Sequence, residues 1–255
     1  PGANVMMAMN ALQETQWEIN LDLLQVICDF ELDSGQVLEG ALVRKYERIR
    51  EIRPKRHFQD AFYDDEDRKS KDTRGTVLEW CRRIIEHNAN VFWHSWVCDF
   101  RGRMLPRCAK LSPQGDDLDR ALIRFKEWKP LDEEGRDWLH VHLHNLMEGV
   151  ESELWGKKDH LSNCHCCGPA RKNQTFENRR QWVEDNLKQL RSIARRPREH
   201  LGLLGLERRR FGKRTDFQRL AVLIELDRVW TEYEDNGGDW SRVTSGQPVY
   251  LDASC

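Results

Sequence analysis

The sequence predicts an α+β fold that is dominated by helices and contains a few short strands. Apolar residues recur at three- and four-residue steps over much of the chain, which is the period of helices that bury one face. The tryptophan-rich stretch VFWHSWVCDF, residues 91–100, instead has the aromatic and β-branched content of a strand. A turn signal at Arg101-Gly102 follows it and predicts a small hairpin with a second short strand.

The helical pattern predicts the following elements in chain order. Apolar residues from Val5 to Phe30 predict one amphipathic helix that begins almost at the first residue. Further helices are predicted over 36–52, 73–91, 116–126, 132–149, 174–194 and 215–234. After a Gly-Gln-Pro turn, Val249-Tyr250-Leu251 predicts a buried strand just before Asp252. Because the pattern starts at once and the chain ends at Cys255, we expect a piece of a longer protein.

Composition limits the possible functions. The chain has 41 basic and 43 acidic residues and a net charge of -2, so any surface for nucleic acid must be local. No apolar run approaches the roughly 20 residues of a membrane helix, and no signal-peptide pattern opens the sequence. These two observations predict an intracellular protein, and the eight cysteines of such a long chain are expected to be mostly reduced.

The short stretch around the predicted turn carries the first functional signal. Arg101 and Arg103 stand two apart across Gly102, so on a hairpin they would share one face. Such a pair can contact consecutive phosphates, or a phosphate and a base edge. The spacing alone equally fits an exposed turn with solvated arginines, in which Asp99 caps the turn.

Three consecutive blocks resemble the single-subunit DNA-directed RNA polymerases of bacteriophage and mitochondrial type. DFRGR resembles the family's Asp-x-x-Gly-Arg motif at Asp99, Gly102 and Arg103. SPQGDDLDRALIRF resembles its Pro-Gln-Gly segment and the following helix, whose basic residue falls on Arg120. The next block is similar at Lys129, Pro130, Leu131, Gly135, Trp138, Leu139, His142 and Asn145. NALQETQWEIN resembles the helix leading into the thumb, and FQRLAVLIEL with VYLDASC resembles the approach to polymerase motif A.

The resemblance implies a domain organisation. Residues 1–91 would form projecting, thumb-like helices, and 92–255 the N-terminal part of a palm, with a Cys/His-containing insertion near 151–173. In the family, the fingers and the second catalytic aspartate follow motif A, so they would lie beyond Cys255. The isolated fragment is therefore expected to be inactive.

The resemblance also implies site residues. Asp252 would be the motif A carboxylate of a two-Mg²⁺ site for nucleotidyl transfer, and the backbone carbonyl of Ala253, where glycine is usual, would face the metal. The residues implied to contact the template or the RNA–DNA hybrid are Arg101 and Arg103, with Gln114 and Arg120 as weaker candidates for the same surface. Leu105 stands where many members have an aromatic residue. Trp138 and His142 are expected to be core residues rather than catalytic ones.

Two further clusters leave alternatives open. Ten basic residues lie between Lys188 and Arg214, which suits either a nucleic-acid surface or a solvated helix face with a basic loop. His160, Cys164, Cys166 and Cys167 lack the Cys-x-x-Cys spacing of zinc knuckles, so we expect a loop with incidental thiols rather than a zinc site.

The resemblance implies a fragment of a DNA-directed RNA polymerase that acts on a DNA template, an RNA product and ribonucleoside triphosphates, without a membrane partner and as a monomer when complete. The alternative is a non-catalytic nucleic-acid-binding module, either a split subunit or a degenerate remnant. A family-A DNA polymerase fits less well, because there Tyr-Ser follows the aspartate, whereas Ala253 and Ser254 follow it here. The expected location is the cytoplasm, of the host if phage-encoded, with the mitochondrion as the alternative.

Overall fold

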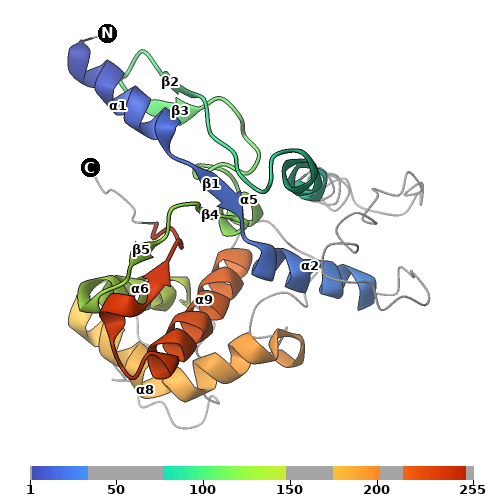
Figure 1. The fold of residues 1–255 in the computed structure, drawn as a ribbon, viewed down its shortest axis with the longest axis vertical. Coiled ribbons are helices and arrows are strands. Elements are labelled where there is room, and N and C mark those ends of the chain that lie inside the picture. Colours follow the sequence, from blue (N-terminus) through green and yellow to red (C-terminus); the bar gives the residue numbers. More distant parts are fainter. Residues whose placement is uncertain (1, 34–76, 148–174, 201–214, 251–255) are drawn as a thin grey trace, which may run out of the picture. The chain divides into compact units, whose positions relative to one another are not determined.

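A computed structural model of the chain describes residues 2–33, 77–147, 175–200 and 215–250 (Figure 1). These residues form mostly helices, with a few short antiparallel strands, so the predicted helix-dominated α+β fold is confirmed. The chain divides after Glu127 into two compact units, which are taken in turn. The helix predicted over 36–52 and the Cys/His-containing stretch near 151–173 lie outside the described residues.

The first unit contains two small antiparallel sheets and several helices. In chain order its elements are α1 (Ala3–Glu14), β1 (Trp17–Ile19), α2 (Leu21–Asp33), a helix over 77–87, β2 (Trp96–Cys98), β3 (Met104–Pro106), α5 (Asp117–Ala121) and β4 (Ile123–Phe125). Strand β1 pairs with β4, and β2 pairs with β3 in the hairpin that the sequence predicts. Within 73–91, the described helical part ends at residue 87.

The prediction of one continuous helix over 5–30 is wrong, because β1 interrupts it. All three residues of β1 are buried, and they pair with β4, which lies more than 100 residues later in the sequence. The backbone of Trp17 also exchanges two hydrogen bonds of 2.9 Å with Phe92. The helix predicted over 116–126 is likewise too long, since α5 ends at Ala121 and Ile123–Phe125 form the partner strand.

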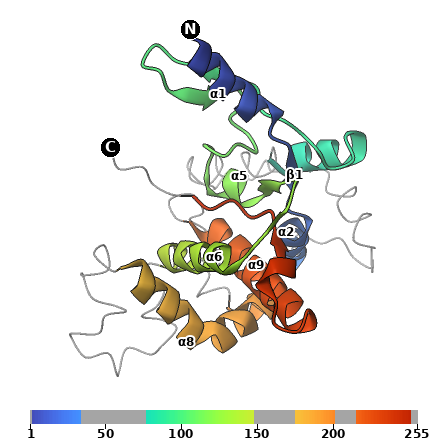
Figure 2. The ribbon, with the colours of Figure 1, turned by 60° about the vertical axis from the view of Figure 1, so that its left-hand side comes forward.

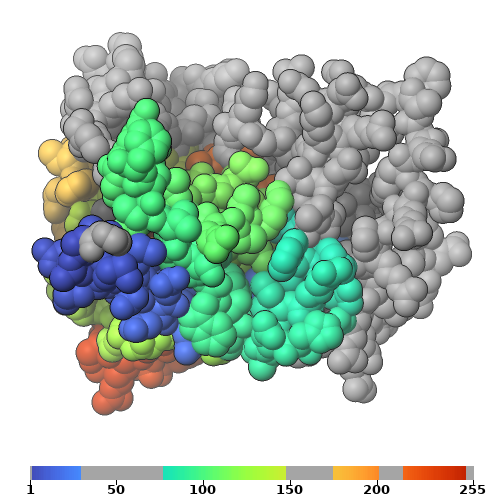
Figure 3. Space-filling view, turned by 90° about the horizontal axis from the view of Figure 1, so that it is seen from above, coloured from blue at the N-terminus to red at the C-terminus, as the bar shows by residue number. Residues whose placement is uncertain are grey.

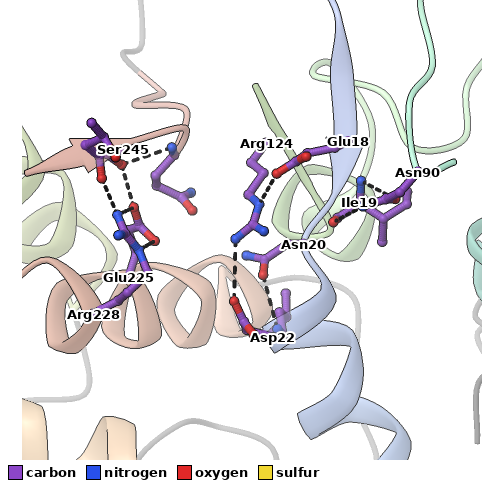
Figure 4. A network of polar contacts seen from close by, with 12 residues as sticks. Glu18, Ile19, Asn20, Asp22, Asn90, Arg124, Glu225, Arg228 and Ser245 are labelled. Atoms are coloured by element: carbon purple, nitrogen blue, oxygen red, sulfur yellow. Dashed lines mark hydrogen bonds and ion pairs between the residues drawn. The ribbon is translucent and has the colours of Figure 1, made fainter. Parts of the chain in front are cut away.

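A buried carboxylate crosses this strand pair (Figure 4). Glu18 is 6% exposed, and its two carboxylate oxygens accept hydrogen bonds from Arg124 Nε at 2.7 Å and Lys126 Nζ at 3.0 Å. Arg124 also lies 3.5 Å from the Asp22 carboxylate on α2. Since a buried charge without a partner is costly, this network specifies which strand β1 pairs with.

Two asparagines complete the surroundings of β1 (Figure 4). Asn90, at a positive φ of 61°, accepts a hydrogen bond from the Ile19 amide at 3.0 Å and donates one to the Ile19 carbonyl at 3.1 Å. The side chain of Asn20 accepts the Leu23 amide at 3.1 Å and so caps the start of α2. The side chain of Asn90 thus satisfies the backbone amide and carbonyl at the end of β1, and Asn20 caps the helix that follows.

Helix α1 packs against β2 but contains no buried residue. Its Met6 and Met7 side chains are exposed, and the blue surface of the helix is visible in Figure 3 beside green residues near β2 and β3.

The second unit is a three-helix core with a small strand pair (Figure 2). Its elements are β5 (Lys129–Pro130), α6 (Glu133–Leu146), α8 (Phe176–Arg195), the 3₁₀ helix Pro197–His200, α9 (Asp216–Asp235), the 3₁₀ helix Trp240–Arg242 and β6 (Thr244–Ser245). Helices α6, α8 and α9 pack against one another, and β5 pairs with β6. The helices predicted over 132–149, 174–194 and 215–234 are confirmed within the described residues.

Helix α9 forms the centre of this unit. Its buried residues include Leu220, Leu223 and Leu226, but also polar side chains. Arg219, 2% exposed, donates to the Leu146 carbonyl at 2.7 Å and to Asp216 at 3.0 Å. The buried guanidinium thereby joins α9 to the end of α6.

The strand predicted at Val249-Tyr250-Leu251 is wrong for the two residues that the structure describes. Val249 and Tyr250 have no regular structure, and Val249 is exposed. The strand pairing occurs earlier, at Thr244–Ser245, where β5 supplies the partner.

Across the described residues, no helix combines the length and the apolar character that crossing a membrane requires.

Ion pairs join α8 to α9. Arg191 Nε lies 2.8 Å and Arg195 Nε 2.9 Å from Asp227, and Arg191 also pairs with Glu234. Burial alone would raise the pKa of Asp227, but hydrogen bonds from Arg195 and Arg191 outweigh burial and hold it below its ordinary value. A carboxylate with a lowered pKa stabilises the fold above its unfolded pKa, and this contribution is lost as the pH falls through the folded pKa.

We predict that Asp227→Asn lowers the free energy of unfolding by about 1 kcal/mol at pH 7, because the pair is partly solvent-screened. The difference from wild type should shrink as the pH falls below about 4, where the carboxylate becomes protonated in the unfolded chain. Urea unfolding at several pH values measures this. Asp185→Asn, at an exposed position of α8, is the control, and an effect of Asp227→Asn that did not change with pH would contradict the prediction.

Candidate nucleic-acid interface

The loop between β2 and β3 is organised by the carboxylate of Asp99. Its Oδ1 accepts the backbone amides of Arg101 and Arg103, each at 2.9 Å, and its Oδ2 accepts Arg103 Nε at 2.7 Å. The Gly102 amide donates to the Asp99 carbonyl at 3.0 Å. These bonds, led by the one from the Arg103 amide, hold the pKa of Asp99 below its usual value. Asp99 is thus a structural anchor of the loop.

Gly102 has a backbone conformation that suits glycine. Its φ is +80°, in the left-handed region that side chains with a Cβ disfavour, although no atom lies within 4 Å of where a Cβ would be. The requirement is therefore conformational rather than steric. The sequence Asp-x-x-Gly-Arg encodes this loop through one acceptor and one flexible residue.

The loop presents cations and an aromatic ring to solvent. Arg101 and Arg103 are exposed, and the side chain of Arg103 is 61% exposed even though it pairs with Asp99. Phe100 is 91% exposed, and the Arg101 guanidinium lies 5.2 Å from the centre of its ring. An exposed aromatic ring beside guanidinium groups can stack on a base while the cations contact phosphates.

A second loop, residues 107–115, is anchored to α5 by a hydrogen bond to the carboxylate of Asp119. Asp119 is 1% exposed, and its carboxylate accepts the Leu111 amide at 2.7 Å. Burial raises the pKa of Asp119, against the opposing effect of that hydrogen bond. A Cβ on Gly115 would lie 2.7 Å from the Asp119 Cβ, so only glycine fits where this loop meets α5.

Gln114 joins the two loops. Its Nε2 donates to the carbonyl of Met104 in β3 at 2.9 Å, which brings Gln114 beside the hairpin that carries Arg101 and Arg103. Arg120 is half-buried on α5, so its guanidinium is less accessible than the two loop arginines. Leu105 is partly buried in β3, opposite Val97. Three of the four predicted nucleic-acid contacts thus lie in connected segments.

An aromatic cluster supports the hairpin from within the unit. His94 is 4% exposed and makes edge-to-face contacts with Trp17, Phe92 and Trp96, at ring distances of 5.7, 5.4 and 6.4 Å. Burial lowers the pKa of His94 to about 4, opposed by a hydrogen bond with the backbone of Leu111. His94 is therefore neutral at pH 7 and contributes packing rather than charge.

Within the third sequence block, Lys129 and Pro130 form β5, and the residues from Gly135 to Asn145 lie on α6. His142 is 2% exposed and its ring is 6.1 Å from that of Tyr250, whereas Trp138 is partly buried in an edge-to-face contact with Phe176. Asn145 is exposed and accepts a hydrogen bond from Arg179 at 2.6 Å. The positions of His142 and Trp138 agree with the core roles expected for these two residues.

The basic cluster between Lys188 and Arg214 is described only as far as His200. In that part Arg191 and Arg195 pair with Asp227, and Arg196 lies 3.5 Å from Glu199. These arginines are thus partly neutralised by acidic neighbours. For these three arginines the structure agrees with a solvated, ion-paired helix face. The basic residues at 201–214 lie outside the described residues.

The predicted metal ligands also lie outside the described residues. Asp252 and Ala253 fall in 251–255, and His160, Cys164, Cys166 and Cys167 fall in 148–174. Among the residues that are described, no group of three His, Cys, Asp or Glu side chains could hold a metal ion. Both the Mg²⁺ site and the expected lack of a zinc site remain predictions.

Sequence reasoning missed Phe100 and Asp119. The exposure of Phe100 has no local signal, since an aromatic residue after a predicted strand is normally expected to be buried. For Asp119, the available signal was an acidic residue four positions after Gly115, within the Pro-Gln-Gly block. Only the fold shows that the two residues are in contact.

Comparison with known proteins finds similarity to RNA polymerases. Residues 129–255 match the model of the family described as DNA-dependent RNA polymerase. The resemblance to the single-subunit RNA polymerases is therefore confirmed. The chain is 24% identical to DNA-directed RNA polymerase 1, mitochondrial, of Arabidopsis thaliana, over 97% of this chain and 23% of the relative.

Two other relatives cover less of the chain. The mitochondrial DNA-directed RNA polymerase of Schizosaccharomyces pombe is 29% identical over 70% of this chain and 12% of its own length. That of Mus musculus is 48% identical over 56 residues, which are 22% of this chain and 5% of the relative. The chain thus spans a quarter or less of these polymerases.

We predict that Gly102→Ala lowers the free energy of unfolding by about 1 kcal/mol, because alanine must adopt a left-handed φ. Gly102→Asn should cost less, since asparagine tolerates this conformation. Urea unfolding of the variants measures both values. Equal destabilisation by Ala and Asn would contradict a conformational origin.

Proposed function

We propose that this chain is a fragment of a DNA-directed RNA polymerase that synthesises RNA on a DNA template by metal-dependent nucleotidyl transfer. The loop built by Asp99 and Gly102 is the observation that carries this proposal, because it gives the Asp-x-x-Gly-Arg motif a geometry that presents Arg101 and Arg103 outward. The relatives are named DNA-directed RNA polymerases, which supports the same interpretation.

In this proposal the two loops bind the template strand or the RNA–DNA hybrid. Arg101 and Arg103 contact phosphates, Gln114 fixes the second loop against the hairpin, and Phe100 offers a face for an unpaired base. Arg107, also exposed, extends the basic surface. Cations dominate this surface, and the one carboxylate in the hairpin loop, Asp99, is occupied by Arg103.

Asp252 would supply a carboxylate ligand for Mg²⁺, and the backbone carbonyl of Ala253 would supply a second oxygen. When bound, Mg²⁺ would lower the barrier to attack by the hydroxyl and help to hold the triphosphate. Oxygen donors suit this hard cation. The substrates are ribonucleoside triphosphates, and the complete enzyme acts as a monomer.

The location that the comparisons support is the mitochondrion, since the relatives above are named mitochondrial polymerases. This favours the alternative over the cytoplasm. The second candidate function, a non-catalytic nucleic-acid-binding module, is supported by the same loops, because they require no metal. Catalysis by the full-length product of the gene separates the two.

Arg103→Ala should lower the affinity for an RNA–DNA hybrid roughly tenfold, about 1.4 kcal/mol. The slope of log K against log salt should fall by about 0.9 for each phosphate that the variant no longer neutralises. Fluorescence anisotropy at several salt concentrations measures both. Arg83→Ala is a matched control, because Arg83 is 60% exposed and pairs with Glu79 much as Arg103 is 61% exposed and pairs with Asp99. Equal effects of the two substitutions would refute a specific contact at Arg103.

Asp252→Ala should reduce Mg²⁺-dependent RNA synthesis by the full-length enzyme at least roughly thousandfold, since removal of a metal ligand costs several kcal/mol of transition-state stabilisation. Hybrid binding should remain, because Arg101 and Arg103 are unchanged. Primer extension and anisotropy on the same preparation separate these effects. Full activity of the variant would remove Asp252 from the metal site, and a wild-type product that binds the hybrid but makes no RNA would favour the binding module.

A further inference from the structure

The buried side chain of Asp119 holds both ends of a short segment, residues 111–115. At one end its Oδ1 accepts the backbone amide of Leu111, which is itself 2% exposed, at 2.7 Å. At the other end Gly115 packs so closely against Asp119 that a Cβ on this glycine would lie 2.7 Å from the Asp119 Cβ. Asp119 thus determines where the segment begins and where it ends.

Leu111 adopts a backbone conformation that is unfavourable for leucine. Its φ is +49°, in the left-handed region that side chains with a Cβ disfavour. The hydrogen bond from its amide to Asp119 and a further backbone hydrogen bond with buried His94 offset this cost. Such strain persists only where the surroundings fix the backbone, and it is concentrated at functional sites. The path of residues 111–115 is therefore imposed by the contacts around it.

The segment presents one exposed polar side chain, that of Gln114. Its backbone amide donates to Ser112 Oγ at 3.2 Å, and its side-chain Nε2 donates to the Met104 carbonyl at 2.9 Å. Met104 directly follows Arg103, so the side-chain amide lies beside the hairpin loop. A primary amide has two N–H donors, and the Met104 carbonyl takes one of them. The second donor can bind a ligand at the exposed surface.

We propose that Asp119 is a positioning residue for Gln114, which donates its second side-chain N–H to a phosphate or sugar oxygen of the bound nucleic acid. The inference rests on the proposed function, in which the two loops bind an RNA–DNA hybrid beside Arg103. Glutamine is among the side chains that contact the sugar–phosphate backbone. A neutral hydrogen bond weakens steeply when it is misaligned, so this contact requires the buried support that Asp119 gives.

The competing explanation is that Asp119 only stabilises the first unit. Its removal would then affect hybrid binding no more than the removal of a comparable buried acceptor. Asn20 is such an acceptor in the same unit, because it is 4% exposed and accepts the Leu23 amide at 3.1 Å. Asn20→Ala is therefore the matched control, since Asn20 lies between β1 and α2 and in neither of the two loops.

Fluorescence anisotropy with a labelled RNA–DNA hybrid tests the proposal in the 255-residue chain. Asp119→Ala and Gln114→Ala should each weaken binding roughly two- to tenfold, the value of one neutral hydrogen bond. The slope of log K against log salt should keep its wild-type value in both, because Gln114 neutralises no phosphate. Arg103→Ala, in contrast, should reduce that slope.

A double-mutant cycle shows whether Asp119 acts through Gln114. The double variant should bind as weakly as either single variant, because both substitutions remove the same contact. Asp119→Asn keeps an acceptor for the Leu111 amide and should retain more affinity than Asp119→Ala. Gly115→Ala displaces the segment from its other end without altering Asp119, and it should reproduce the loss seen with Gln114→Ala. Urea unfolding of each variant establishes that the folded chain is being compared.

Three results would overturn the proposal. They are wild-type binding by Gln114→Ala, losses that multiply in the double variant, and a loss for Asp119→Ala no larger than that for Asn20→Ala. Arg103→Ala and Arg83→Ala, measured in parallel, separate the two levels. If these two bind equally, the proposed function fails. If Arg103→Ala alone weakens binding while Gln114→Ala and Asp119→Ala do not, only the positioning role fails.

Discussion

Buried carboxylates determine how distant segments of this chain meet. Glu18 joins β1 to β4, Asp119 joins α5 to the 107–115 loop, and Glu225 joins α9 to β6. Each is at most 6% exposed, and an unpaired carboxylate at that depth would cost several kcal/mol. An alternative pairing of these segments would separate at least one carboxylate from its partner, so the three contacts select the observed arrangement within each unit.

Sequence periodicity predicts helices correctly where the helix buries one continuous apolar face. It does not predict a strand whose pairing partner lies far away in the sequence. Helices α6 and α8 agree with their predicted spans because their apolar spacing is sustained over many turns. The segment 5–30 has the same spacing, yet Trp17–Ile19 form a strand, because pairing with β4 satisfies backbone groups and Glu18 at once. Periodicity contains no information about that distant strand.

For the candidate site, the sequence predicts which residues take part better than it predicts the contacts that each of them makes. Asp99 caps the turn as one alternative expects, and Arg101 and Arg103 stay exposed, so their contact with phosphates stays a prediction. The link from Gln114 to Met104 could not be predicted, since it depends on how two loops ten residues apart pack. The exposure of Phe100 likewise follows from the tightness of the loop rather than from residue type.

The two candidate sites place different demands on the chain. The loop of Asp99 is built from five consecutive residues, so a short motif encodes it and the surrounding unit need only hold its ends. The segment 244–250 depends instead on Glu225 and Arg228, about 20 residues before β6, and on His142, more than 100 residues before Tyr250. A phosphate contact tolerates small shifts of a flexible guanidinium, whereas a metal ligand does not. Non-local support is therefore expected where geometry must be fixed, and a local motif suffices where charge must only be presented.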